Sequence, residues 1–130
     1  WPFYPGTGAA DDTGLGAGKG YTLNCPFASG SGRSEIMGAF RDRLIPAMRS
    51  FRPEFVFISA GFDGRVGDPI GHFVLSDADF SELTDLVMGI AAEHAQGRVV
   101  SALEGGYDLK GLASAVGAHV ARLSAAAAAS

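Results

Sequence analysis

The amino-acid sequence predicts an α/β protein built around a parallel β-sheet. Two apolar runs, residues 55–60 (FVFISA) and 99–103 (VVSAL), have the length and composition of buried strands. Each run breaks into a glycine-containing loop, and about 15 to 20 residues with helical spacing of apolar side chains follow each loop. Strands that alternate with helices in this way form parallel sheets through right-handed crossovers. The 130 residues, 47% hydrophobic and 18% charged, predict one globular domain.

The N-terminal part of the chain is predicted to contain an irregular segment, a short strand and a helix. Residues 1–20 are rich in proline and glycine and therefore cannot form a long helix or strand. Residues 21–25 (YTLNC) are rich in strand formers and end at Pro26, so they predict a third, short strand. Apolar residues at helical spacing over residues 34–51 predict an amphipathic helix. Because Pro46 lies inside this helix, we expect a kink or a restart about one turn earlier.

The remainder of the chain alternates strand and helix. The continuous apolar run at 55–60 is typical of a strand that is covered on both faces. A sequence that resembles a capping box, SDAD at 76–79, begins a helix predicted over residues 77–96. After the strand at 99–103, a third helix is predicted to begin near Asp108. The residues expected on its buried side are Leu109, Leu112, Val116, Val120 and Leu123.

Composition argues against several classes of function. The net charge of -4 and the scattering of the basic residues argue against nucleic-acid binding. The single cysteine, Cys25, cannot form an internal disulfide, and no apolar run reaches the roughly 18 residues of a membrane span. The motif GLGAGKG at 14–20 lacks the first glycine and the Ser or Thr of a phosphate-binding loop. We therefore expect a soluble, cytoplasmic protein with no direct nucleic-acid or membrane partner.

Two functional side chains are predicted at the carboxyl ends of the strands, where open parallel sheets bind ligands. Asp63 follows the strand at 55–60, and Tyr107 follows the strand at 99–103. If these strands are neighbours, the carboxylate and the phenol face one crevice. A carboxylate suits a divalent metal and a phenol can donate to a polarised carbonyl, so the pair fits metal-assisted hydrolysis. On local grounds alone, Asp63 is equally well explained as a turn residue or a helix cap.

Other polar residues near these loops are better explained by structure. Asp68 precedes Pro69, a pairing that commonly starts a turn, so we predict a structural role for it. His94 and His119 fall on predicted helices at or near the apolar side and are expected to be hydrogen-bonded histidines rather than metal ligands. His72 lies in the loop after Asp63, but one histidine in a loop indicates little by itself.

Three stretches together resemble one protein family: PFYPGTG at 2–8, SAGFDGRVGDPIG at 59–71 and LEGGYDL at 103–109, with GYTLNCP between the first two. In order and spacing they resemble the C-terminal half of a histone deacetylase-like amidohydrolase, and most closely its class II and bacterial acetylpolyamine amidohydrolase branch. The resemblance implies a three-layer, arginase/deacetylase-like α/β fold with a parallel sheet. The chain would form the C-terminal portion of that fold over residues 1–124, followed by an alanine-rich tail at 125–130.

The resemblance also implies an activity, the hydrolysis of N-acetyl groups on acetyl-lysine or acetylpolyamines with zinc or another divalent metal. Asp63 matches a metal-ligand aspartate, and Tyr107 matches the tyrosine that hydrogen-bonds the acetyl carbonyl and the tetrahedral intermediate. Gly105 and Gly106 would give the tyrosine loop its freedom. Tyr4 matches an aromatic residue that lines the narrow acyl-lysine channel, where a flat apolar wall suits a methylene chain.

Two further residues are given roles by the resemblance. Tyr21 is similar to a residue whose backbone carbonyl contributes to a structural potassium site. His72 stands where relatives often carry a small residue, so it is expected at the rim of the cleft, where it would influence substrate choice.

The family's other catalytic groups, an Asp-x-His pair and a tandem histidine pair, belong to an N-terminal half that this sequence does not include. One protein ligand cannot hold catalytic zinc in the usual three-ligand arrangement, so the isolated chain is expected to be inactive. The alternative interpretation is a non-catalytic interaction module derived from the same fold. In both cases the face that the N-terminal half would cover should be apolar, so the free chain should bind copies of itself.

Overall fold

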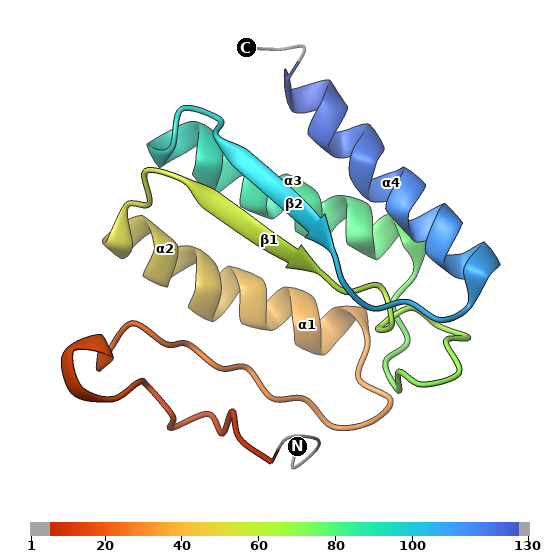
Figure 1. Cartoon of the computed structure of the whole chain (residues 1–130), viewed down its shortest axis with the longest axis horizontal. Helices are drawn as coiled ribbons and strands as arrows, with labels where there is room; N and C mark the ends of the chain where they lie inside the picture. The colour runs from red at the N-terminus through yellow and green to blue at the C-terminus, as the bar shows by residue number, and fades with distance from the viewer. Residues whose placement is uncertain (1–5, 128–130) are drawn as a thin grey trace.

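The computed structural model describes residues 6–127 of the chain. Two parallel strands form the sheet, and helices pack on one of its faces and beside its first strand (Figure 1). The elements are the 3₁₀ turn η1 (Gly16–Gly18), α1 (Arg33–Ala39), η2 (Phe40–Leu44), α2 (Ile45–Phe51), β1 (Val56–Ala60), α3 (Asp77–His94), β2 (Val99–Leu103) and α4 (Leu109–Ala127). None of the helices within the described residues is both long and apolar enough to cross a membrane.

The sheet confirms the predicted α/β class. β1 and β2 pair in parallel, with Val56 opposite Val99 and Ala60 opposite Leu103. Because α3 connects the two strands, both strands end at the same edge of the sheet. This edge is where the predicted functional residues follow the strands.

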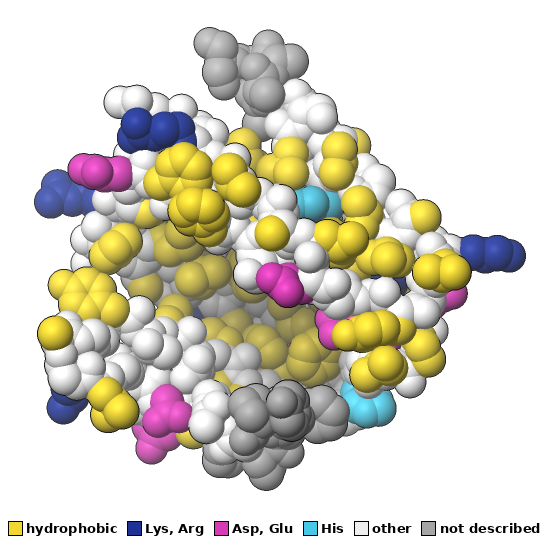
Figure 2. Space-filling model, viewed as in Figure 1, with side chains coloured by type: hydrophobic (Ala, Val, Ile, Leu, Met, Phe, Trp, Pro, Cys, Tyr) yellow, Lys and Arg dark blue, Asp and Glu magenta, His cyan; other side chains and the backbone are white. Residues whose placement is uncertain are grey.

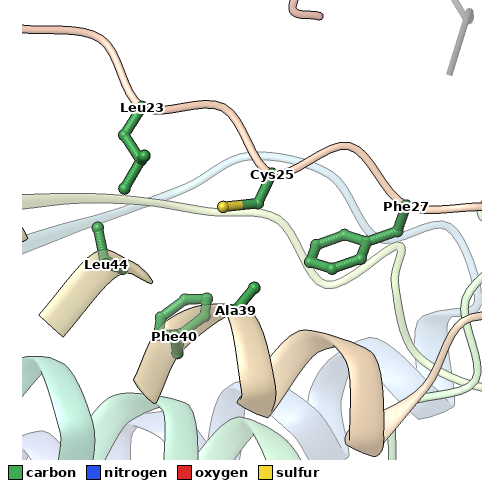
Figure 3. Close-up of a pocket in the computed structure, with 6 residues that line it drawn as sticks. All are labelled: Leu23, Cys25, Phe27, Ala39, Phe40 and Leu44. Atoms are coloured by element: carbon green, nitrogen blue, oxygen red, sulfur yellow. The ribbon is translucent and has the colours of Figure 1, made fainter. Parts of the chain in front are cut away.

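The strand predicted at residues 21–25 is not formed. The segment is extended, but it pairs with no strand among residues 6–127 and runs alongside α1, η2 and α2 instead (Figure 1). Its side chains and those of the helices line a half-open apolar pocket of about 250 Å³ (Figure 3). The residues that line it are Leu23, Cys25, Phe27, Ala39, Phe40 and Leu44. Strand-forming residues therefore serve here to pack an extended segment against a helix.

The helix predicted over residues 34–51 is present and is interrupted as expected. Its middle section, η2, is a π-helical turn in which the N–H of Ile45 donates to the carbonyl of Phe40. This wider turn comes directly before Pro46, which has no N–H to donate to the preceding turn. The proline is therefore accommodated by a local rearrangement, and the helix restarts as α2.

The core lies between the sheet and α3 and α4. Ala60 and the loop residue Phe62 pack with Phe80 of α3 and Ala115 of α4 in the main cluster. The buried side of α4 differs from the predicted one, because Leu109 is 80% exposed and Val120 is 48% exposed. The residues of α4 that pack inward are Leu112, Ala115, Val116 and His119. A small residue and a polar one occupy half of these positions, and hydrophobic periodicity does not detect them.

The opposite face of the sheet is not covered by any described residue. Phe57 is 78% exposed, and Val100, its neighbour across the sheet, is 48% exposed. Phe55 packs against Phe57, with their ring centroids 4.7 Å apart. Figure 2 shows hydrophobic side chains over the strands and a hollow between the strands and the N-terminal segment. The prediction that both faces are covered is therefore wrong for residues 6–127. The buried face accounts for Val56 and Ala60 but not for Phe57, whose apolar side chain lies on the uncovered face.

His119 of α4 is buried and hydrogen-bonded at both ring nitrogens, as the sequence predicted. Thr84 Oγ1 donates to the carbonyl of Phe80 at 2.6 Å, so it accepts from His119 Nδ1, which lies 2.7 Å away. His119 Nε2 is then the acceptor for the Ser101 hydroxyl, at 2.9 Å. This assignment holds for the neutral ring, which burial favours, and the ring links α3, α4 and β2. Burial lowers the pKa of His119 from its usual value.

This buried histidine predicts that stability falls in mild acid. In the unfolded chain His119 takes up a proton below a pH of about 6.5, whereas in the folded chain burial lowers its pKa and delays protonation. The free energy of unfolding should therefore decrease as the pH falls below about 6.5 and level off below the folded pKa, by about 1.4 kcal/mol for each unit of pKa difference. Urea unfolding between pH 7.5 and 5 measures this slope. In His119→Gln the new side chain does not titrate, so the free energy of unfolding should change less with pH than in the wild type. An identical pH dependence in the two proteins would contradict the prediction.

Candidate functional site

The candidate site lies where the two strands end. Glu104 N–H donates to the carbonyl of Ala60 at 3.0 Å, and Phe62 N–H donates to the carbonyl of Gly105 at 2.8 Å. These bonds extend the pairing of β1 and β2 by about a residue into the loops that follow them. The loop after β1 and the loop after β2 therefore leave the sheet side by side (Figure 1).

Asp63 is half-buried in the loop after β1, and glycines make room for its carboxylate. A Cβ atom at Gly105 would lie 2.7 Å from Asp63 Oδ2, and one at Gly61 would lie 3.1 Å from Oδ1. Within residues 6–127 the carboxylate accepts no hydrogen bond, so it does not cap a helix. Asp63 does lie in a turn, at residues 62–65, in which Arg65 N–H donates to the carbonyl of Phe62 at 3.1 Å. The turn interpretation therefore holds for the backbone of Asp63, whereas its carboxylate takes no part in the turn.

The loop after β1 folds back over Asp63. The backbone of Gly71 lies so close to it that a Cβ atom at Gly71 would be 1.6 Å from the Asp63 carbonyl oxygen. Such a contact is possible only for glycine. The sequence showed that this loop is rich in glycine, but it did not indicate which glycine carries the close approach.

Tyr107 lies in the loop after β2, and its side chain is 51% exposed. Its backbone N–H donates to Asp68 Oδ2 at 2.7 Å. The two glycines that precede Tyr107 lie so close to neighbouring atoms that a side chain would not fit at either position. This requirement is separate from any conformational freedom that glycine gives the loop. Gly105 faces the Asp63 carboxylate, and Gly106 has a φ of +141° with its missing Cβ directed at Leu112 Cδ1, 2.6 Å away.

Asp68 links the two loops. Its Oδ1 accepts from the N–H groups of Ile70 at 2.9 Å and Gly71 at 2.8 Å, which is the turn that the sequence predicted. Its Oδ2 accepts from Tyr107, 39 residues away. Burial opposes the charged form, but hydrogen bonds from Gly71, Tyr107, Ile70 and Asp108 outweigh it and lower the pKa of Asp68. The local sequence predicts the turn at Asp68, but it does not predict the hydrogen bond from Tyr107 in the loop after β2.

A salt bridge between Arg65 and Asp77 connects the loop after β1 to the start of α3. Arg65 Nε donates to Asp77 Oδ1 at 2.6 Å, and the Ser114 hydroxyl of α4 donates to Asp77 Oδ2 at 2.6 Å. These two hydrogen bonds outweigh burial and lower the pKa of Asp77. The start of α3, the loop and α4 are thus held together beside the site.

The remaining predicted residues lie away from these contacts or outside the described residues. Tyr21 is 74% exposed and meets Phe51 edge to face. His72 is exposed, and its backbone carbonyl accepts from the N–H of Gly30 at 2.7 Å. Tyr4 falls outside the described residues. The potassium-site, rim and channel roles of these three residues therefore stay predictions.

The described residues do not by themselves form a metal site. In the part of the chain that the structure describes, no three His, Cys, Asp or Glu side chains converge. His119 is held by Thr84 and Ser101. His94 Nε2 is buried, lies 3.3 Å from Glu93 Oε1 and has no hydrogen-bond partner among the described residues, so the prediction that His94 is hydrogen-bonded is wrong. The half-buried Asp63 carboxylate has the hard oxygen donors that suit zinc, but it fits as only one ligand of a larger set.

Comparison with protein families decides the relationship. The family model described as the histone deacetylase domain matches residues 1–123. The chain belongs to the histone deacetylase family. This membership confirms the family that the three sequence stretches indicated, and the α/β fold agrees with it.

Relatives of this histone deacetylase chain are similar over most of its length. A probable deacetylase of Archaeoglobus fulgidus is 38% identical over 110 residues, which are 85% of this chain and 31% of the relative. Human histone deacetylase 7 is 40% identical over 127 residues, which are 93% of this chain and 13% of the relative. The crystal structure of the HDA15 HD domain superposes with a TM-score of 0.86 at 37% identity and covers 93% of this chain and 34% of that one. The chain therefore spans between 13% and 34% of the length of these relatives.

Proposed function

We propose that the whole protein is a zinc-dependent deacetylase that hydrolyses acetyl-lysine or acetylpolyamine, and that this chain supplies Asp63 as a metal ligand and Tyr107 as a hydrogen-bond donor. The observation that carries the proposal is the Asp63 carboxylate at the carboxyl edge of the sheet. It is flanked by Gly61 and Gly105, and among residues 6–127 it accepts no hydrogen bond. A half-buried carboxylate placed in this way is suited to a cation.

Zinc in catalytic sites usually has three protein ligands, so two more ligands would come from outside the described residues. Lewis-acid activation of the amide carbonyl and of water is the chemistry that zinc supplies when bound. Asp63 contributes negative charge and an oxygen donor for this purpose. The isolated chain of 130 residues is accordingly proposed to be inactive.

Tyr107 is proposed to act on the substrate. Its phenol is half-exposed on the loop beside Asp63, where it can donate a hydrogen bond to the acetyl carbonyl oxygen. Negative charge develops on this oxygen as the amide is attacked, so the hydrogen bond is stronger in the transition state than in the bound substrate. Tyr107 therefore contributes mainly to kcat.

The test is Tyr107→Phe in the whole protein, with an acetyl-lysine peptide and an acetylpolyamine as substrates. Loss of one such donor should lower kcat by about 100- to 1,000-fold and leave KM within a few-fold, because substrate contacts elsewhere are unchanged. Zinc content should not change, because the phenol is not proposed as a ligand. Tyr21→Phe, at an exposed tyrosine on the N-terminal segment, is the matched control and should keep wild-type kcat. A Tyr107→Phe enzyme with wild-type kcat would refute the proposed role.

A second candidate function is a non-catalytic interaction module, for which the uncovered face of the sheet would be the binding surface. Phe57 and Val100 present apolar surface that a binding partner could bury. This alternative predicts that the whole protein hydrolyses neither substrate and that Phe57→Ser weakens binding of the partner. Measurable hydrolysis by the wild-type protein separates the two functions.

A further inference from the structure

The carboxylate of Asp68 bonds to both loops of the candidate site. Oδ1 accepts from Ile70 and Gly71 of its own loop at 2.9 and 2.8 Å, and Oδ2 accepts from Tyr107 of the loop after β2 at 2.7 Å. Hydrogen bonds from backbone N–H groups to an ionised carboxylate are among the stronger ones in proteins.

Each side of this bridge leads to one of the proposed functional residues. On one side, the Asp68 turn holds Gly71, whose backbone lies against the Asp63 carbonyl. On the other side, the carboxylate holds the backbone N–H of Tyr107 itself. Gly105 and Gly106 come directly before Tyr107 and carry no side chains that could anchor the loop.

We propose that Asp68 is the positioning residue that sets the placement of Tyr107 relative to Asp63. This inference rests on the proposed function, because the spacing matters only if both residues serve one reaction. It also extends that function, because Asp68 touches neither metal nor substrate and acts through the backbone of two loops. A turn residue would hold only Ile70 and Gly71.

Asp68→Asn separates the bridge from the turn. An amide offers one oxygen, so asparagine can accept from one loop while its NH₂ group faces the N–H donors of the other. Amide hydrogen exchange should therefore accelerate on one loop, at Tyr107 or at Gly71, by about 10- to 100-fold. Exchange on the other loop should stay within about twofold of wild type. Asp68→Ala should accelerate both, and Asp42→Asn, at an exposed carboxylate of η2, should accelerate neither.

The kinetic part uses the same variants in the whole protein. Asp68→Asn should lower kcat for an acetyl-lysine peptide by about tenfold or more, with KM, zinc content and Tm close to wild type. If the wild type hydrolyses no acetylated substrate, the proposed function fails, while the exchange data still test the bridge. If Asp68→Asn keeps wild-type kcat, or leaves exchange on both loops unchanged, the positioning role is wrong.

Discussion

Replacing Gly71 with alanine is expected to lower the free energy of unfolding by about 3 kcal/mol, because the new Cβ atom cannot be accommodated. It would lie 1.6 Å from the Asp63 carbonyl oxygen and 2.5 Å from the carbonyl carbon. Both atoms belong to the backbone, so a change of side-chain rotamer cannot relieve the contact. The loop must move away from Asp63 or Asp63 must move with it.

Urea or thermal unfolding of Gly71→Ala measures this effect. Gly89→Ala is the matched control, because Gly89 lies in the exposed part of α3 and has no atom within 4 Å of the Cβ position. Alanine favours helix over glycine, so the control should gain up to about 1 kcal/mol. A Gly71→Ala variant as stable as wild type would contradict the described contact between the loop and Asp63.

The prediction of the secondary structure from sequence succeeded where the pattern is local. β2 has the predicted bounds, Val99–Leu103, and α3 begins at Asp77 with the predicted cap, in which Ser76 Oγ accepts from Asp79 N–H. The interruption before Pro46 also has a local cause, the missing N–H of proline. Capping, proline and short-range periodicity depend on residues a few positions apart, so the sequence alone determines them.

Prediction failed where a distant partner decides the structure. The residues at 21–25 have strand propensity, but a strand also needs a neighbour, and their side chains pack on α1 and η2 instead. His119 occupies the buried side of α4 because Thr84 and Ser101 satisfy its two nitrogens. Hydrophobic periodicity takes no account of such pairs.

The same distinction holds at the candidate site. The topology of parallel sheets was sufficient to predict that the loops carrying Asp63 and Tyr107 lie at one edge. The role of Asp68 as a link could not be predicted, because a Gly-Asp-Pro turn has the same sequence whether or not a distant N–H donates to it. Asp68 and Tyr107 are 39 residues apart in the sequence, and only the folded structure brings the Asp68 carboxylate to the Tyr107 N–H.

The largest functional effect is expected for Asp63→Ala in the whole protein. Removal of one ligand of a catalytic zinc should weaken zinc binding by more than about 100-fold, since changes outside the ligand shell already cost 10- to 100-fold. Hydrolysis of acetylated substrates should then fall to background. Relative to the metal-free wild type, stability should change little, because the Asp63 side chain accepts no hydrogen bond within the described residues.

Asp42→Ala is the matched control for this change. Asp42 is an exposed carboxylate on η2, outside the loops at the carboxyl edge. Its replacement by alanine changes the net charge of the protein by the same amount as Asp63→Ala. Zinc content and activity should remain at wild-type levels. A loss of zinc in both variants would point to a general effect of charge and would contradict the assignment to Asp63.

The most direct test of the account is the zinc stoichiometry and affinity of the whole protein, measured by metal analysis after dialysis and by competition with a chelator. For the wild type we predict one tightly bound zinc per chain. For Asp63→Ala we predict loss of that zinc, with folding confirmed by a thermal transition equal to that of the metal-free wild type. Equal stoichiometry and affinity in wild type and Asp63→Ala would show that Asp63 is not a metal ligand and would contradict the central claim.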